Sequence, residues 1–122
     1  MYALALAVIL VASPYDVARE KAMSTGTPLF IVVSAAWCPS CQVMIKTTIP
    51  ALAKQGRMRH VVYTVVDVDK NPTVAEKLLK LAESEAIPTL LLFHVQEKRW
   101  RYRVHIGAMD AEELQKFLTV RR

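Results

Sequence analysis

The chain has 122 residues, of which 53% are hydrophobic and 22% are charged. This size and composition are typical of one compact domain around a single core, and they exclude a second domain of ordinary size. The chain has only three glycines and no tract of biased composition, so it shows no long linker, low-complexity arm or internal repeat. The formal net charge of +5 would suit an acidic partner, so the positions of the basic residues matter.

Residues 1–13 form an uncharged apolar segment with large side chains at every second position from Tyr2 to Leu10. The alternation favours a first β-strand, whereas the apolar composition also fits the core of a secretory signal. The missing positive leader, and Pro14 directly after the segment, speak against a signal. The segment is too short for a transmembrane helix. Two interpretations of residues 1–13 therefore stay open, a strand or a signal-like segment, and the domain proper is expected over 14–122.

A helix is expected next, followed at once by a buried strand. Ser13 is the predicted cap and Pro14 the predicted first residue of this helix. It should run to about Thr25 and be closed by Gly26. Residues 28–35 are an almost unbroken apolar run rich in branched side chains. Such a run is typical of a strand buried on both faces, which predicts a central position in the sheet.

The middle of the chain alternates between helix and strand. Apolar residues recur at helical spacing from Cys38 or Pro39 to about Lys54. A second buried strand is predicted over 61–68, and another helix over 73–82. Helices placed between consecutive strands predict crossover connections and parallel pairing.

Two strands with little between them come next, over 89–93 and 99–106, and predict an antiparallel hairpin. Alternation in the second strand gives it one apolar face and one cationic face. The apolar face carries Trp100, Tyr102, Val104 and Ile106, and the cationic face carries Arg99, Arg101, Arg103 and His105. We interpret this as a half-buried edge strand whose solvated positive charge opposes edge-to-edge pairing. A nucleic-acid surface is therefore not expected.

The last helix is predicted to begin after the capping residue Asp110 and to bury Leu114, Phe117 and Leu118. Together these elements predict an α/β fold of three layers, α/β/α. Its mixed central sheet ends in an antiparallel hairpin and is covered by helices on both faces.

The two cysteines, Cys38 and Cys41, are three residues apart at the start of a predicted helix. At this spacing their sulfurs lie one turn apart and can form a reversible disulfide. The first cysteine lies at the helix N-terminus, where unpaired N–H groups and the helix dipole lower the pKa of a thiol. Cys38 is thus the expected nucleophile and Cys41 the expected resolving thiol. Pro39 suits the first helical turn, and Ser40 adds a small polar group near both sulfurs.

A C-x-x-C pair also occurs in zinc sites, but these need a second pair or two histidines at short spacing. His60, His94 and His105 are too far apart in sequence for that. We therefore expect no metal and no cofactor beyond the redox-active disulfide. A purely structural disulfide is not expected either, because so short a loop restrains little chain entropy.

Three motifs in combination resemble the thioredoxin superfamily, over about residues 14–118. The run Ala36-Trp37-Cys38-Pro39-Ser40-Cys41 after a buried strand looks like the W-C-x-x-C of that family. The run over 66–72, Val-Asp-Val-Asp-Lys-Asn-Pro, looks like its third strand and turn, and Ile87-Pro88-Thr89 looks like its cis-proline loop. The predicted order of elements is also similar to that of the thioredoxin fold.

The resemblance implies a substrate-binding loop opposite the cysteines. The Ile87-Pro88 bond would be cis, and Ile87 would offer its N–H and C=O to an extended substrate. Thr89 belongs to the same expected substrate-binding set. Gly107 matches the glycine beside this groove, where a side chain would block the approach of a substrate. Trp37, next to the nucleophile, is expected on the substrate surface.

The chain departs from thioredoxins in its interior. By alignment, Val32 and Val65 occupy the positions of a buried Asp and its Lys partner, which assist proton transfer at the second cysteine. With both positions apolar, this proton must pass to another acceptor. Ser34 and Gln42 also replace an aromatic and a basic residue of the family. In these departures, and in its ending over 107–113, the chain resembles the thioredoxin-like domains of bacterial envelope disulfide-interchange proteins.

The expected function is that of an enzyme, a thiol–disulfide oxidoreductase that acts on protein thiols or disulfides and on a redox partner. We expect a monomer, with membrane association only if residues 1–13 are a signal or anchor. The resemblance favours the bacterial cell envelope or periplasm, with the cytoplasm as the alternative. The alternative function is a non-catalytic binding module that uses the groove beside the cis-proline loop, and the absent charge pair at Val32 and Val65 keeps this alternative open.

Overall fold

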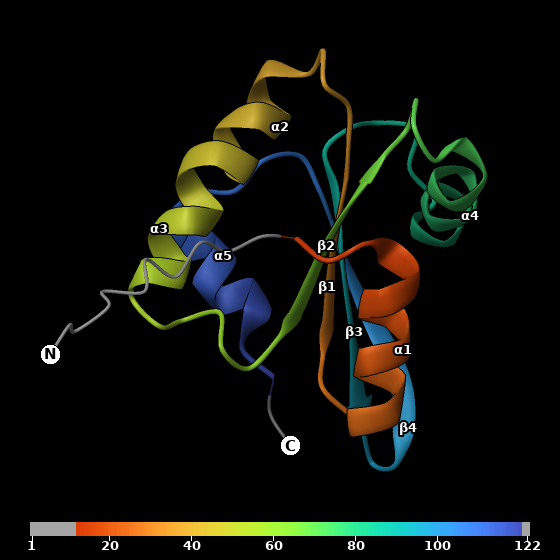
Figure 1. Ribbon diagram of the computed structural model, residues 1–122, viewed down its shortest axis with the longest axis vertical. Helices are drawn as coiled ribbons and strands as arrows, with labels where there is room; N and C mark the ends of the chain where they lie inside the picture. Colours follow the sequence, from red (N-terminus) through yellow and green to blue (C-terminus); the bar gives the residue numbers. More distant parts are fainter. Residues whose placement is uncertain (1–11, 121–122) are drawn as a thin grey trace, which may run out of the picture.

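The computed structural model describes residues 12–120, so the expectations for residues 1–11 lie outside the described residues. In chain order the elements are α1 (Tyr15–Thr25), β1 (Leu29–Ser34), α2 (Pro39–Val43), a π-helical segment η1 (Met44–Thr48), α3 (Ile49–Lys54), β2 (Val62–Asp67), α4 (Pro72–Ala82), β3 (Thr89–Gln96), β4 (Arg99–Ile106) and α5 (Ala111–Leu118). Helices α1 and α4 cover one face of the sheet, and α2, α3 and α5 cover the other (Figure 1). The predicted three-layer α/β class is confirmed.

Strand β1 is central within the described part of the sheet, whose order is β2-β1-β3-β4. It pairs in parallel with β2 and antiparallel with β3, and β3 pairs antiparallel with β4. All of its residues are buried. Phe30 and Val32 face the core beneath α3 and α5, whereas Ile31 and Val33 face the core beneath α1 and α4. Burial on both faces explains the continuous apolar run in the sequence.

The start of α1 differs from the prediction. Pro14 occupies the capping position itself, without a side-chain hydrogen bond, and the helix begins at Tyr15. Ser13 cannot cap because its backbone is bonded to β2: its N–H donates to Tyr63 O at 3.2 Å, and its C=O accepts from Thr64 Oγ1 at 2.7 Å. The predicted end is confirmed, since Gly26 adopts the left-handed conformation with φ of 72°.

The helical stretch over 39–54 has the predicted extent but not a regular α-helical pattern. Its middle, η1, is a π-helical turn in which the N–H of Ile49 bonds to the carbonyl of Met44, five residues earlier. Pro50 follows directly, has no N–H to donate, and would press its ring on the carbonyl of Lys46 in a regular helix. A widened turn relieves this clash.

The β3–β4 hairpin is longer than predicted and closes tightly. Its strands pair as far as Gln96 and Arg99, which leaves a two-residue turn. In this turn Glu97 and Lys98 have φ of 52° and 65°, as a type I′ turn requires.

The two faces of the edge strand β4 are covered differently from the prediction. The cationic face is not fully solvated, because the end of α5 lies over it: Arg103 Nη2 donates to Thr119 O at 2.6 Å, and the ring of His105 packs edge-on against Phe117. On the other face, Trp100 and Tyr102 stay 40% and 44% exposed. Alternation therefore predicted which residues share a face, but not how far each face is covered.

The two later helices begin as predicted. Pro72 is the first residue of α4, and Asp110 forms a capping box with Glu113 at the start of α5. In the described residues, 12–120, no helix combines the length and the apolar character needed to cross a membrane.

Candidate active site

Cys38 and Cys41 form a disulfide at the end of the sheet where β1 leads into α2, at the top of Figure 1. Cys38 occupies the capping position of α2, and its Sγ accepts a hydrogen bond of 3.3 Å from the backbone N–H of Cys41. The two Cα atoms are 5.3 Å apart. Cys38 is 6% exposed and Cys41 is fully buried. The predicted pairing is confirmed, and Cys38 is the sulfur that lies nearer the surface.

The loop between β1 and α2 is fixed by one carbonyl. Ala35 O accepts the N–H of Cys38 at 3.1 Å and the side-chain Nε2 of Gln42 at 3.0 Å. Pro39 takes the first helical position, where a missing N–H costs nothing. Ser40 Oγ lies 3.5 Å from Cys38 Sγ. Gln42, which the sequence presented only as the replacement of a basic residue, thus ties the helix to its loop.

The cis-proline loop faces the cysteines, as the resemblance implied. The Ile87-Pro88 bond is cis, and Cys38 Sγ lies 4.0 Å from the carbonyl oxygen of Ile87. The carbonyl of Pro88 accepts the N–H of Gly107 at 2.8 Å. Gly107 has φ of 101°, and among the described residues, its two chain neighbours aside, a Cβ there would meet no atom within 4 Å. Within the chain, the backbone conformation rather than crowding therefore calls for glycine.

A buried pair of hydroxyls holds this loop from behind. Thr89 Oγ1 donates to Ala86 O at 2.6 Å and lies 2.8 Å from Ser84 Oγ. Ser84 Oγ in turn accepts the N–H of Ala86 at 3.1 Å. Sequence reasoning included Thr89 only as part of the cis-proline motif and missed Ser84, because a lone serine after a helix carries no distinguishing signal.

Trp37 lies at the surface beside the disulfide and is 67% exposed. Its Nε1 donates to Asp69 Oδ2 at 2.8 Å, which joins the active-site loop to the turn after β2. Asp67 stabilises that turn, since its Oδ1 accepts the N–H groups of Asp69 and Lys70 at 2.8 and 3.1 Å. The partner Asp69 was also missed, although it stands inside the motif over 66–72.

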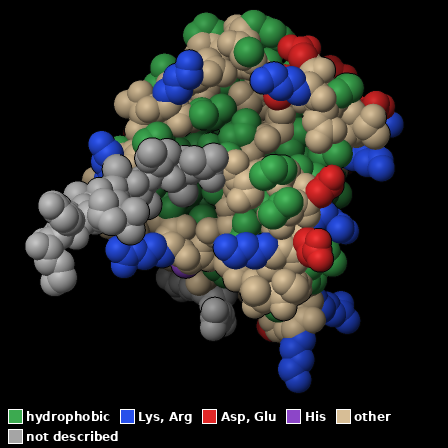
Figure 2. Space-filling view, in the orientation of Figure 1, with side chains coloured by type: hydrophobic (Ala, Val, Ile, Leu, Met, Phe, Trp, Pro, Cys, Tyr) green, Lys and Arg blue, Asp and Glu red, His purple; other side chains and the backbone are tan. Residues whose placement is uncertain are grey.

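Exposed apolar side chains lie on the elements around the disulfide. Besides Trp37, they include Val43 of α2 and Ile106, which pairs with Thr89 at the active-site end of the hairpin. Figure 2 shows hydrophobic side chains gathered at this end of the molecule.

The interior below the disulfide is apolar. Val32 and Val65 are register partners on β1 and β2, and both belong to the core under α3 and α5. The cysteines themselves pack with Ala35, Val68 and Ile87. Tyr63 is in the same core as Val32, but burial raises its pKa above the ordinary value of a phenol, so it stays neutral and supplies no base. Val32, Val65 and the neutral Tyr63 therefore offer no acceptor for a proton that leaves Cys41.

The described residues hold no group of three or more His, Cys, Asp or Glu side chains that could bind a metal ion. The three histidines lie apart from the disulfide. His60 bonds to Leu118 O at 2.9 Å, His105 packs on Phe117, and His94 is buried in β3.

A mixed sheet between two helical layers, with a disulfide at a helix start opposite a cis-proline, defines a thioredoxin-like redox fold. The family model for thioredoxin matches residues 14–120, so the chain belongs to the thioredoxin family. Among solved structures, a thioredoxin from Thermus thermophilus superposes with a TM-score of 0.69 at 20% identity, covering 86% of this chain and 81% of that one. The Trxlp protein of Edwardsiella tarda EIB202 gives a TM-score of 0.65 at 28% identity, covering 88% of this chain and 97% of that one.

A curated relative indicates the branch of the family. The chain is 30% identical over 106 residues to the thiol:disulfide interchange protein DsbD of Klebsiella pneumoniae. This match covers 87% of the chain but only 18% of the relative. The chain thus spans less than a fifth of the length of the curated relatives that it matches. The match agrees with the resemblance to envelope disulfide-interchange proteins.

Proposed function

We propose that this domain catalyses thiol–disulfide exchange with protein substrates, with Cys38 as the nucleophile and Cys41 as the resolving thiol. The observation that carries the proposal is the position of Cys38 Sγ. It lies in a disulfide at the start of α2 and 4.0 Å from the carbonyl of Ile87. The backbone of Ile87 can then pair with an extended substrate peptide while a cysteine sulfur of that peptide reaches Cys38.

In the proposed reaction the Cys38 thiolate attacks one sulfur of a substrate disulfide. The substrate S–S bond breaks, its second sulfur leaves as a thiolate that takes up a proton, and a mixed disulfide remains on Cys38. Cys41 then loses its proton and attacks Cys38 Sγ, which forms the Cys38–Cys41 bond and releases the first substrate sulfur as a thiolate that is protonated in turn. Two electrons pass to the substrate, and the reverse sequence oxidises a substrate dithiol. The N–H of Cys41, which already bonds to Cys38 Sγ in the disulfide, is in position to donate to the Cys38 thiolate as well.

The test compares the full chain with Cys38→Ser and Cys41→Ser. We expect wild type to accelerate insulin reduction by dithiothreitol and both variants to stay at background. Cys41→Ser should accumulate a mixed disulfide with a cysteine-containing peptide, because nothing resolves it, whereas Cys38→Ser should not. In the reduced wild type, alkylation of Cys38 should set in at a lower pH than that of Cys41. Background rates for wild type, with no exchange between its disulfide and dithiothreitol, would overturn the proposal.

The apolar pair Val32 and Val65 favours one other candidate, a non-catalytic module that binds a partner through the groove near Ile87 and Trp37. Such a module needs no proton acceptor for Cys41. Peptide affinity that is the same in wild type and Cys38→Ser, together with background insulin reduction by both, would favour this candidate.

The similarity to DsbD also bears on the partners and the compartment of this domain. We propose that the domain exchanges electrons with protein thiols and one redox partner in the bacterial envelope, as a monomer. The similarity to DsbD supports this placement. Sedimentation of the full chain tests the monomer, and cell fractionation tests the compartment.

A further inference from the structure

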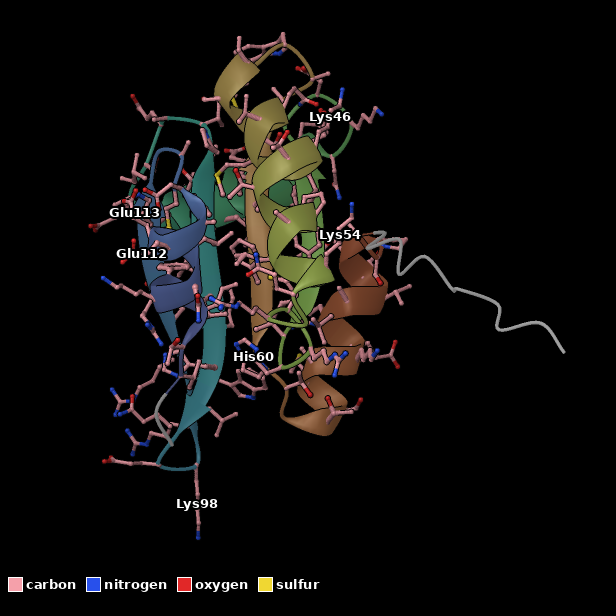
Figure 3. The ribbon with its side chains drawn as sticks, turned by 90° about the vertical axis from the view of Figure 1, so that its left-hand side faces the viewer. Lys46, Lys54, His60, Lys98, Glu112 and Glu113 are labelled. Atoms are coloured by element: carbon pink, nitrogen blue, oxygen red, sulfur yellow. A yellow bond between two sulfur atoms is a disulfide. The ribbon has the colours of Figure 1, made fainter. Side chains whose placement is uncertain are left out.

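A second cleft, of about 640 Å³, opens beside the end of the β3–β4 hairpin that points away from the cysteines. Its walls come from β3, β4 and the last turn of α5, and they include His94, Arg101, Arg103, Lys116 and Thr119. Figure 3 shows nitrogen-tipped side chains around the hairpin below α5. Neither the proposed exchange reaction nor the packing of the core uses this cleft.

Positive charge dominates the cleft. Arg101, Arg103 and Lys116 line it. Arg103 is held in place because its Nη2 donates to Thr119 O at 2.6 Å, and its other N–H groups are left for a ligand. Lys116 Nζ lies 3.6 Å from Glu112 Oε1 in an exposed pair. In the described part of the chain neither arginine forms a salt bridge, so the cationic cleft attracts an anion.

His94 adds a buried group that lacks a partner. Its side chain is 6% exposed, it pairs in register with Arg101, and its Nδ1 is enclosed without a hydrogen bond in residues 12–120. Burial first, then the charges of Arg103 and Arg101, lower its pKa, so the ring is neutral near pH 7. A neutral imidazole carries one proton, and a proton on Nε2 would leave only a lone pair enclosed at Nδ1. The ring then presents a donor on the side away from Nδ1.

We propose that this cleft binds a phosphate group, with Arg101, Arg103 and Lys116 supplying charge and His94 donating a hydrogen bond. Guanidinium groups bond to phosphate oxygens in pairs, and a phosphate offers enough acceptors for several donors at once. Because the cleft is open, the phosphate can be free in solution or be the headgroup of a larger molecule such as a phospholipid.

Binding of a phosphate has a distinctive effect on His94. A bound anion favours the charged imidazolium and therefore raises the pKa of His94. The other charged groups at the cleft are Arg101, Arg103 and Lys116, and Lys116 pairs with Glu112. His60, bonded to Leu118, and His105, packed on Phe117, serve as internal references.

The first arm titrates the full chain with inorganic phosphate at constant ionic strength and follows the histidine ring signals by NMR. We expect saturable shifts at His94, a raised pKa of His94, and smaller changes at His60. Arg101→Gln should weaken phosphate binding about tenfold, the effect of one lost charge-assisted hydrogen bond. Arg19→Gln, which removes the same charge from exposed α1, should leave the Kd within about twofold. Because Arg103 anchors Thr119, Arg103→Gln is used only as a second variant, after its fold is checked.

The second arm measures sedimentation with vesicles of phosphatidylcholine alone or with added phosphatidylglycerol. Binding to the anionic vesicles that Arg101→Gln loses and Arg19→Gln keeps would assign the site to a lipid headgroup. Binding of free phosphate without vesicle binding would assign it to a soluble phosphate. The proposal is overturned if neither ligand gives a saturable response at His94, or if Arg19→Gln weakens binding as much as Arg101→Gln.

Discussion

The side chain of Ser84 makes several of the hydrogen bonds that support the cis-proline loop. Its hydroxyl lies between Thr89 Oγ1 and the backbone of Ala86, and all three groups belong to the segment that carries Ile87 towards Cys38. Ser84 and Thr89 are both buried, so the bond between their hydroxyls is shielded from water. The loop geometry opposite the disulfide therefore depends on a residue outside the recognisable motif.

We expect Ser84→Ala to lower the free energy of unfolding by about 1–3 kcal/mol, because the buried hydroxyl of Thr89 loses its bond to Ser84. Urea denaturation of the oxidised chain measures this loss. Ser24→Ala is the matched control: its hydroxyl bonds to Lys21 O at 3.2 Å on an exposed helix face, and its loss should stay within about 0.5 kcal/mol. Equal effects of the two substitutions would mean that the buried hydroxyl pair does not stabilise the loop.

At the residue scale, the sequence predicted what depends on local spacing. Cys38 and Cys41 lie one helical turn apart, so their pairing follows from their separation and the helix. The bond between Trp37 and Asp69 joins residues 32 positions apart, and the cleft around His94 needs β3, β4 and α5 together. Spacing says nothing about such contacts, because they exist only once the sheet has brought distant segments together.

Among the elements, the β3–β4 hairpin has a turn whose residues do not suit its backbone. Both Glu97 and Lys98 have positive φ, a conformation that costs residues with a Cβ and that Asn and Gly adopt readily. The turn is held because the strands pair on both sides of it.

Replacement of Glu97-Lys98 by Asn-Gly should therefore stabilise the chain by about 1 kcal/mol. Thermal unfolding, read as the change in Tm, measures the gain. Lys77→Gly, at an exposed position inside α4, provides the opposite control, since glycine within a helix should cost about 1 kcal/mol. A loss of stability in the Asn-Gly variant would show that the side chains of Glu97 and Lys98 matter more than their backbone strain.

The elements themselves were predictable wherever the apolar pattern reports burial, as in the unbroken apolar run of β1. Their irregular parts were not. The π-helical turn η1 follows from Pro50, whose effect is on the hydrogen-bond pattern and not on which residues face the core. Ser13 failed as a cap because β2 competes for its backbone, and such competition between elements has no local signal.

In the whole molecule, the fold and the disulfide are thermodynamically linked. The disulfide closes a loop of only four residues, counting both cysteines, which by chain entropy alone stabilises the folded chain by about 2 kcal/mol. Full burial of Cys41 among apolar neighbours acts in the same direction, because such surroundings suit the uncharged sulfur of a disulfide. The N–H of Cys41 acts in the opposite direction by stabilising the thiolate of Cys38.

We expect the first two effects to prevail, so that the oxidised chain resists urea better than the reduced chain by about 2 kcal/mol. Folding and disulfide formation form a closed thermodynamic cycle. The equilibrium constant for oxidation by glutathione should therefore be about 30-fold larger for the folded chain than for the unfolded chain. Unfolding curves of the oxidised and reduced chain measure the difference in stability, and glutathione equilibria with and without urea measure the difference in oxidation constant. Cys41→Ser cannot form the disulfide, so its stability should be the same under oxidising and reducing conditions. A reduced form that is the more stable one would mean that the start of α2 holds the Cys38 thiolate in preference to the disulfide, and the domain would then favour oxidation of its substrates.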